Sequence, residues 1–209
     1  YACLPMLALY PLALGWVCYQ LAIKLGDHKR RLSALSLTDS LTGLFNHGAW
    51  KDLLQLKFQA CKQRQEHAVI ALIDIDHFKT INDTFGHVVG DCVLRQLSAE
   101  LRRSLREGDQ AGRYGGDEFC VILPEISEAQ ACQVMERLRE RVSSYRNPQL
   151  PHLRISLSIG LSPFEANLES PEHWLEQADK ALYIAKHAGR DQVNFAPGQA
   201  AALRLAYPD

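Results

Sequence analysis

Two acidic segments carry side chains that suit metal-dependent chemistry. The letters DID at residues 74–76 follow a continuous apolar run, and GGDE at residues 115–118 lies where a hairpin would turn. A carboxylate at the end of a buried strand is costly to desolvate unless a cation balances it. Two such carboxylates on neighbouring strands would repel each other unless a divalent cation lay between them, and ligands made only of oxygen suit Mg²⁺ or Mn²⁺. Taken alone, the pattern is a weak signal, because many hairpins use Asp and Gly for the turn itself.

The elements that must position these turns are predicted from apolar periodicity. Segments of helical period alternate with short runs rich in Ile and Val, in the order α-β-α-β-β-α-β-α-β. The expected helices are 47–65, 90–106, 127–145 and 171–188, and the expected strands are 67–75, two halves of a hairpin within 110–123, 153–162 and 192–195. This order predicts an α+β fold of the split βαβ, or ferredoxin-like, kind, in which helices flank a mostly antiparallel sheet.

The composition limits the classes of protein to consider. Hydrophobic residues make up 47% of the 209, which suits a packed core, and Lys plus Arg (23) nearly balance Asp plus Glu (24). This balance argues against nucleic acid as the main partner, since duplex-binding domains usually carry a basic surplus. The six cysteines are scattered without a C-x-x-C pair, which favours reduced thiols of a cytosolic protein over a disulfide framework or a zinc site.

Residues 1–38 have a different character. Residues 1–23 contain no charged side chain, and about 20 apolar residues can span a bilayer as a helix. Basic residues gather within residues 24–31, as they do on the cytoplasmic flank of a membrane helix. A buried soluble helix is the alternative, and Pro5 and Pro11 weaken a straight helix, although membrane helices tolerate proline. A signal peptide is not expected, because no basic segment precedes the apolar run and no small-residue cleavage site follows it. Since the chain begins with Tyr1, we expect it to be the end of a longer protein.

Four segments resemble the GGDEF family of diguanylate cyclases. RYGGDEF at 113–119 contains the motif that names the family, LTDSLTGLFN at 37–46 resembles its entry motif, IDIDHFKTINDTFGHVVGD at 73–91 its metal and guanine segment, and ALYIAKHAGRDQV at 181–193 its closing helix. Their order and spacing follow the family over residues 37–195. One departure is His47, where the entry motif usually has Arg. We expect His47 to lie away from the catalytic motifs and to affect only a local salt bridge.

The resemblance implies a fold and a reaction. The fold would be that of the nucleotidyl cyclases and the polymerase palm, and the reaction would join two GTP molecules into cyclic di-GMP with release of two pyrophosphates. Residues 1–31 also resemble the last membrane helix and basic exit of a sensor domain found on some bacterial cyclases. The domains expected are a membrane helix at 1–23, a basic flank and linker at 24–38, the cyclase domain at 39–197 and a tail at 198–209. The cyclase domain would then lie on the cytoplasmic side of the bacterial inner membrane.

The resemblance also implies a two-metal catalytic site. Asp74 and Asp117 would ligate two Mg²⁺ or Mn²⁺ ions, with the carbonyl of Ile75 as a further ligand. Glu118 would be either a metal ligand or the base for the attacking 3′-hydroxyl, and both roles stay open. Lys79 would stabilise the transition state electrostatically. The remaining alternative for Asp117 is a simple turn residue.

Substrate-binding residues follow from the same match. A loop from Phe78 to Asn82 would cradle the β- and γ-phosphates with its backbone N–H groups. Lys186 and Arg190 would bind the triphosphate, and their spacing of four places them on one face of the last helix. Without the resemblance, such a pair would more often be a solvated face near a helix C-terminus.

Guanine recognition would fall to two other side chains. Asn82 and Asp91 would contact the base, since a carboxylate accepts from guanine N1–H and the exocyclic amine. His87, between them in sequence, would contact the nucleotide. Taken alone, Asn82 in an N-D-T turn is most often a cap.

An R-x-x-D pattern formed by Arg106 and Asp109 precedes the hairpin. In the family this position binds the product and inhibits the enzyme, and Arg137 matches a secondary arginine for the same product. Alone, the pattern would be a trivial surface turn.

Three alternatives in function remain. A catalytically inactive receptor for GTP or cyclic di-GMP is the main one, although degenerate members typically lose residues that are all present here. A structural adaptor would have no reason to keep the acids and the guanine-reading residues, and an adenylyl cyclase would lack the guanine pair. An active enzyme would be a homodimer, because each domain holds one GTP and bond formation needs two.

Overall fold

A five-stranded sheet forms the centre of the domain. The computed structural model describes residues 16, 19–20, 36–146, 150 and 152–196. The strands are β1 (Ala68–Ile75), β2 (Gln110–Arg113), β3 (Glu118–Pro124), β4 (Leu157–Pro163) and β5 (Gln192–Phe195). Their spatial order is β2-β3-β1-β4-β5. All neighbours are antiparallel except β4 and β5, which are parallel because a helix crosses over between them.

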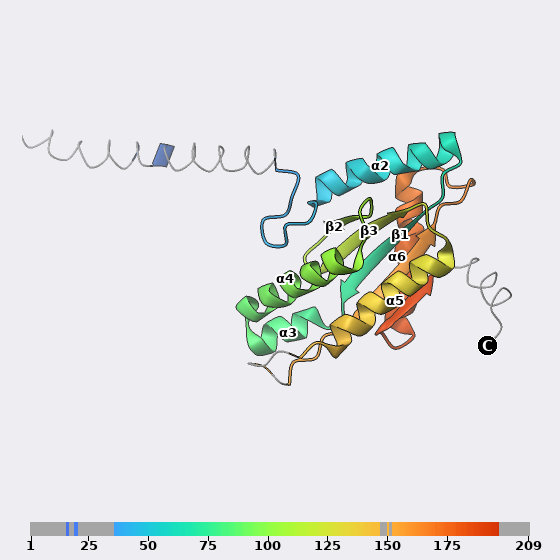
Figure 1. Ribbon diagram of the computed structural model, residues 1–209. Coiled ribbons are helices and arrows are strands. Elements are labelled where there is room, and N and C mark those ends of the chain that lie inside the picture. The colour runs from blue at the N-terminus through green and yellow to red at the C-terminus, as the bar shows by residue number, and fades with distance from the viewer. Residues whose placement is uncertain (1–15, 17–18, 21–35, 147–149, 151, 197–209) are drawn as a thin grey trace, which may run out of the picture. The chain divides into compact units, whose positions relative to one another are not determined.

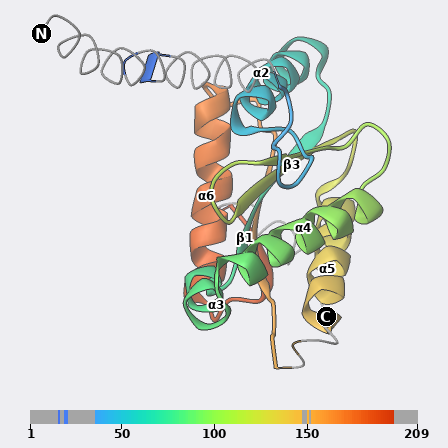
Figure 2. The same cartoon turned by 90° about the vertical axis from the view of Figure 1, so that its left-hand side faces the viewer.

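Helices cover both faces of the sheet. On one face lie α3 (Phe78–Phe85), α4 (His87–Ser104) and α5 (Glu128–Ser144), and on the other lie α2 (His47–Arg64) and α6 (Pro171–His187), as Figures 1 and 2 show. The expected α+β class with flanking helices is therefore confirmed. The expected mostly antiparallel sheet is confirmed too, and its one parallel pair is β4 with β5.

Strand β1 is buried on both faces, which explains its continuous apolar sequence. Its side chains alternate between two cores: Ile73 belongs to the core under α4 and α5, and Ile70 to the core under α2 and α6. The second core is built around Trp50 and Trp174, both fully buried. Gly160 on β4 lets α6 approach closely, because a Cβ there would collide with the backbone of α6 at Ala178 and Leu182.

Most predicted elements occur within a few residues of their expected bounds, and one helix was missed. Residues 78–82, predicted to form a loop, are the beginning of α3. The sequence FKTINDTF is a single short helix that ends at Gly86, whose φ of 84° suits glycine. Strand β4 begins at Leu157 rather than at 153.

The N-terminal predictions lie largely outside the described residues. Most of the expected membrane helix at 1–23, most of the basic flank at 24–38 and the tail at 198–209 belong to the part of the chain that the structure leaves undescribed. Within the described part, no helix combines the length and the apolar character that crossing a membrane requires. The chain divides into two units, Tyr1–Leu37 and Thr38–Asp209.

Candidate active site

The two acidic segments meet on neighbouring strands. In the antiparallel register of β1 and β3, Asp74 lies opposite Glu118, and the N–H of Ile75 donates to the carbonyl of Asp117 at 3.4 Å. The predicted neighbourhood of the two turns is therefore present. Three carboxylates and a backbone carbonyl therefore lie where β1 ends and β3 begins, at the same end of these two neighbouring strands.

Asp74 is the most buried acid of this group. Only 8% of the residue is exposed, and Lys186 Nζ lies 2.7 Å from its Oδ2. Burial raises the pKa of Asp74, the hydrogen bond and charge of Lys186 oppose that rise, and the charges of Asp117 and Glu118 add to it. Lys186 therefore offsets part of the effect of burial on the pKa of this carboxyl group.

The donors suit a hard divalent cation in their chemistry. Asp74, Asp117, Glu118 and the Ile75 carbonyl offer only oxygen, which is the ligand set of Mg²⁺. Within the described ranges, however, no three acidic, His or Cys side chains are gathered in an arrangement that could already hold a metal ion. In this structure the ammonium group of Lys186 contacts the Asp74 carboxylate instead.

Asp76, the second acid of the first turn, serves a different purpose. Only 4% of it is exposed, and its oxygens accept from Ser156 Oγ at 2.7 Å and Ser158 Oγ at 2.6 Å. The backbone N–H of Asp191 also donates to its Oδ2, at 3.1 Å. Asp76 therefore has its hydrogen-bond partners inside the protein and does not belong to the group of candidate metal ligands.

The hairpin between β2 and β3 is closed by its own backbone. The N–H groups of Tyr114 and Gly115 both donate to the carbonyl of Glu118, at 2.8 and 3.2 Å. A Cβ on Gly115 would lie 2.6 Å from Glu118 Oε2, whereas one on Gly116 would meet no atom within 4 Å. Glycine at 115 therefore leaves room for the Glu118 carboxylate, and the main chain at Gly116 is open to a ligand.

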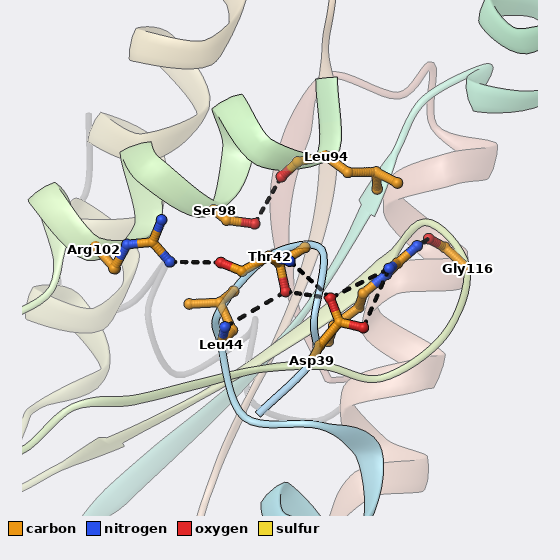
Figure 3. Close-up of polar contacts among 8 residues, drawn as sticks. Asp39, Thr42, Leu44, Leu94, Ser98, Arg102 and Gly116 are labelled. Atoms are coloured by element: carbon orange, nitrogen blue, oxygen red, sulfur yellow. Dashed lines mark hydrogen bonds and ion pairs between the residues drawn. The ribbon is translucent and has the colours of Figure 1, made fainter. Parts of the chain in front are cut away.

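Arg113 connects this hairpin to the entry segment. Its Nη2 donates to the carbonyl of Gly116 at 2.7 Å, and its Nη1 lies 3.3 Å from Asp39 Oδ1. Asp39 also accepts from the backbone and hydroxyl of Thr42, and Thr42 is held to α4 by Arg102, as Figure 3 shows. Sequence analysis missed this connection, although both of its ends lie in segments that the resemblance singled out.

We expected His47 to lie away from the catalytic motifs, and this expectation is wrong. Its ring meets Tyr114 edge-on with 4.6 Å between the centroids, and Trp50 packs on the same tyrosine at 5.9 Å. His47 therefore replaces the arginine of the family motif with an aromatic contact to the residue next to Gly115.

Between positions 78 and 91, the residues expected to bind the nucleotide lie on α3 and α4, the two helices that follow β1 in the chain. Phe78 and Lys79 begin α3 directly after β1, so the N–H groups of this first turn are free of helical partners. A Cβ on Gly90 would collide with Asn82 Oδ1, so Asn82 packs against the residue that precedes Asp91. His87 begins α4 and is exposed.

Lys186 and Arg190 do not share a helical face. Helix α6 ends at His187, and Gly189, with a φ of 118°, turns the chain. Arg190 itself has a φ of 65°, and its N–H donates to the carbonyl of Ala185 at 3.0 Å. The spacing of four therefore predicted the wrong geometry, because the helix ends before Arg190.

The three residues expected to bind product line one cavity. Arg106, Asp109 and Arg137 lie around a cavity of about 600 Å³ between the β2 side of the sheet and α5. Asp109 accepts from the backbone N–H of Arg106 at 3.0 Å and pairs with its Nε at 3.3 Å. The Asp109 side chain is 3% exposed and that of Arg106 54%, so the aspartate is the buried partner and the arginine is the accessible one.

Known proteins resemble this chain in sequence and in fold. The family model described as "Diguanylate cyclase, GGDEF domain" matches residues 36–192. The probable diguanylate cyclase DgcC of Escherichia coli (strain K12) is 42% identical over 193 residues, which is 92% of this chain and 52% of the relative, so the chain spans about half of its length. The diguanylate cyclase DgcP of Pseudomonas aeruginosa is 43% identical over 163 residues, 77% of this chain and 24% of the relative. The crystal structure of the GGDEF domain of DgcB from Caulobacter crescentus in complex with c-di-GMP is 34% identical, covers 77% of this chain and 95% of that one, and superposes with a TM-score of 0.72.

Proposed function

The chain belongs to the GGDEF-domain family of diguanylate cyclases, and from that premise we propose that it condenses two GTP molecules into cyclic di-GMP with release of two pyrophosphates. The observation that carries the proposal is the pairing of Asp74 with Glu118 across β1 and β3, beside Asp117 and Lys186. Three carboxyl groups and a backbone carbonyl, which offer only oxygen ligands at the ends of two neighbouring strands, support a Mg²⁺-dependent phosphoryl transfer.

Asp74, Asp117, Glu118 and the Ile75 carbonyl would hold one or two Mg²⁺ or Mn²⁺ ions. When bound, such ions lower the pKa of the attacking 3′-hydroxyl and neutralise charge on the α-phosphate and the leaving pyrophosphate. Glu118 can act either as a ligand or as the base for that hydroxyl. Lys186, which pairs with Asp74 in this structure, would pair with a phosphate when a cation occupies the carboxylate.

The triphosphate would lie against the first turn of α3, where unpaired N–H groups and the helix dipole favour an anion. Lys79, Lys186 and Arg190 would add positive charge around it. Asn82, which packs against Gly90, and Asp91, the residue after that glycine, would read the guanine edge. This set binds one nucleotide, so we propose that two chains face each other as a homodimer and that each supplies one GTP.

Product regulation is a further part of the proposal. Cyclic di-GMP would bind in the cavity of Arg106, Asp109 and Arg137, where the two arginines can pair with its phosphates. Binding there would inhibit the reaction from a site separate from the metal ligands. We also propose that residues 1–23 anchor the protein in the bacterial inner membrane, with the cyclase domain on its cytoplasmic side.

Incubation of the chain with GTP and Mg²⁺, followed by chromatography of the nucleotides, tests the activity. Cyclic di-GMP and pyrophosphate should form, and the specific activity should rise with protein concentration because the active species is a dimer. Binding of GTP or cyclic di-GMP without turnover would instead support the inactive receptor. A rate per chain that does not change with concentration, from a demonstrated monomer, would refute the homodimer.

A further inference from the structure

The loop after α6 has an unusual backbone. Arg190 and Asp191 are consecutive residues with φ values of 65° and 45°, in the left-handed region that residues other than glycine rarely adopt. Such a conformation persists only where surrounding contacts enforce it. We therefore expect residues outside this loop to hold its backbone in place by hydrogen bonds.

Two side chains from distant parts of the sequence hold Asp191. Arg139 on α5 donates from Nη1 to Asp191 Oδ1 at 2.9 Å, and buried Asp76 at the end of β1 accepts from the Asp191 N–H at 3.1 Å. Arg139 is itself fixed, because its side chain is only 18% exposed and its Nε donates to Glu136 Oε2 at 2.7 Å. The loop is thus tied at one residue to both α5 and β1.

We propose that Arg139 is a positioning residue for Arg190, acting through Asp191. The inference rests on the proposed function, in which exposed Arg190 binds the triphosphate. A long exposed side chain binds an anion more tightly when its backbone is already held in place, because less conformational entropy is then lost on binding. Arg139 and Asp76 fix the residue next to Arg190, so they fix the point from which its guanidinium reaches the phosphates.

Binding calorimetry separates this role from a general structural one. The ligands are 3′-deoxy-GTP with Mg²⁺, which lacks the attacking hydroxyl, and GMP, which lacks the phosphates that Arg190 would reach. Arg139→Ala should weaken binding of 3′-deoxy-GTP about tenfold and leave the affinity for GMP unchanged. Arg190→Ala should do the same, and the double variant should be no weaker than Arg190→Ala alone, since the two residues act as one unit.

Arg141→Ala is the matched control, because Arg141 lies on the same helix and is exposed; it should bind both ligands like the parent. Thermal unfolding checks that each variant is folded. If Arg139→Ala does not fold, Asp191→Asn replaces it, because this substitution removes the negative charge of the ion pair and keeps the backbone N–H that donates to Asp76. Asp191→Asn should then lower the affinity for 3′-deoxy-GTP several-fold and leave the affinity for GMP unchanged.

Three outcomes would each overturn the inference. They are an unchanged affinity for 3′-deoxy-GTP in the folded variants, an equal loss of affinity for GMP, and losses of affinity that add in the double variant. A parent chain that binds neither nucleotide would instead overturn the proposed function on which it rests.

Discussion

Arg113 joins Asp39 to the turn of the acidic hairpin between β2 and β3. Its guanidinium lies 3.3 Å from Asp39 Oδ1 and donates to the Gly116 carbonyl at 2.7 Å, so one planar group holds both the start of the domain and the backbone that precedes Asp117. Arginine suits this position because its donors are fixed in one plane and can serve two acceptors at once. The entry segment is therefore linked to the backbone that precedes a proposed metal ligand.

Removal of this link should impair catalysis more than folding. Arg113→Ala is expected to lower kcat by about tenfold to 10²-fold, because small displacements of catalytic groups have effects of that size. Steady-state kinetics with GTP would measure the change. Arg95→Ala, on an exposed part of α4, is the control and should match the parent. Equal kcat values for Arg113→Ala and the parent would show that the hairpin keeps its position without the guanidinium.

Asp39 should make the stability of the domain depend on pH. Burial alone would raise its pKa, but hydrogen bonds from Thr42 and the charge of Arg113 outweigh burial and hold the pKa below its ordinary value of 3.8. A carboxyl with a lowered pKa in the folded state contributes stability that is present above pH 3.8 and is lost as the pH falls through the folded-state pKa.

Asp39→Asn should therefore be less stable than the parent at pH 7, by about 1 kcal/mol. The difference should shrink below pH 4 as the parent loses the same interaction. Urea unfolding at several pH values measures it. A difference that stays constant between pH 7 and pH 3 would mean that the charge of Asp39 is not its source.

Loss of a proposed metal ligand should abolish turnover while the fold is kept. Asp74→Ala or Asp117→Ala is expected to lower kcat by at least about 10³-fold, because metal stabilisation of the transition state supplies several kcal/mol and each 1.36 kcal/mol is a factor of ten. The metal-free variants should unfold near the parent's midpoint, since burial already disfavours the charge of Asp74. Product formation and thermal unfolding measure the two effects. Substantial turnover by either variant would remove that residue from the site.

The sequence predicted those features that depend on local pattern or on a close family match. The alternating elements were predicted from apolar periodicity, and the approach of the two acidic turns was predicted because each turn adjoins an expected strand and carboxylates on neighbouring strands suit one cation. The position of Arg190 was predicted wrongly, because the helix was assumed to continue past Gly189. Helix α6 ends at His187 instead. The contact of His47 with Tyr114 and that of Arg139 with Asp191 join residues far apart in sequence, and periodicity carries no information about such pairs.

Guanine selection should depend on Asp91. Asp91→Ala is expected to reduce the preference for GTP over ATP by up to about 10⁴-fold, because a site that pairs with the donors of its own substrate rejects analogues that lack them. Competition assays with the two nucleotides would measure the ratio. Asp83→Ala, an exposed acid on α3, should leave the preference unchanged. Kinetics of Asp91→Ala that match the parent would assign guanine recognition to other residues.

Product inhibition should depend on the accessible arginine of the R-x-x-D pair. Arg106 is half exposed at the cavity it shares with Arg137, whereas Asp109 is buried and holds Arg106 by its backbone and its Nε. Arg106→Ala should therefore remove the group that pairs with a phosphate of cyclic di-GMP, and it should leave the metal ligands undisturbed.

We expect an initial rate of Arg106→Ala equal to or above that of the parent, and progress curves without product inhibition. Calorimetry should show at least a tenfold loss of affinity for the product, which equals about 1.4 kcal/mol. Inhibition of the parent should be noncompetitive with GTP, because the cavity is separate from the substrate residues. Arg103→Ala is the control, since Arg103 lies in the last turn of α4, is more exposed than Arg106 and pairs with Glu100; it should keep both inhibition and affinity. If Arg106→Ala still bound cyclic di-GMP and responded to it like the parent, Arg106 and Asp109 would form only a solvated turn.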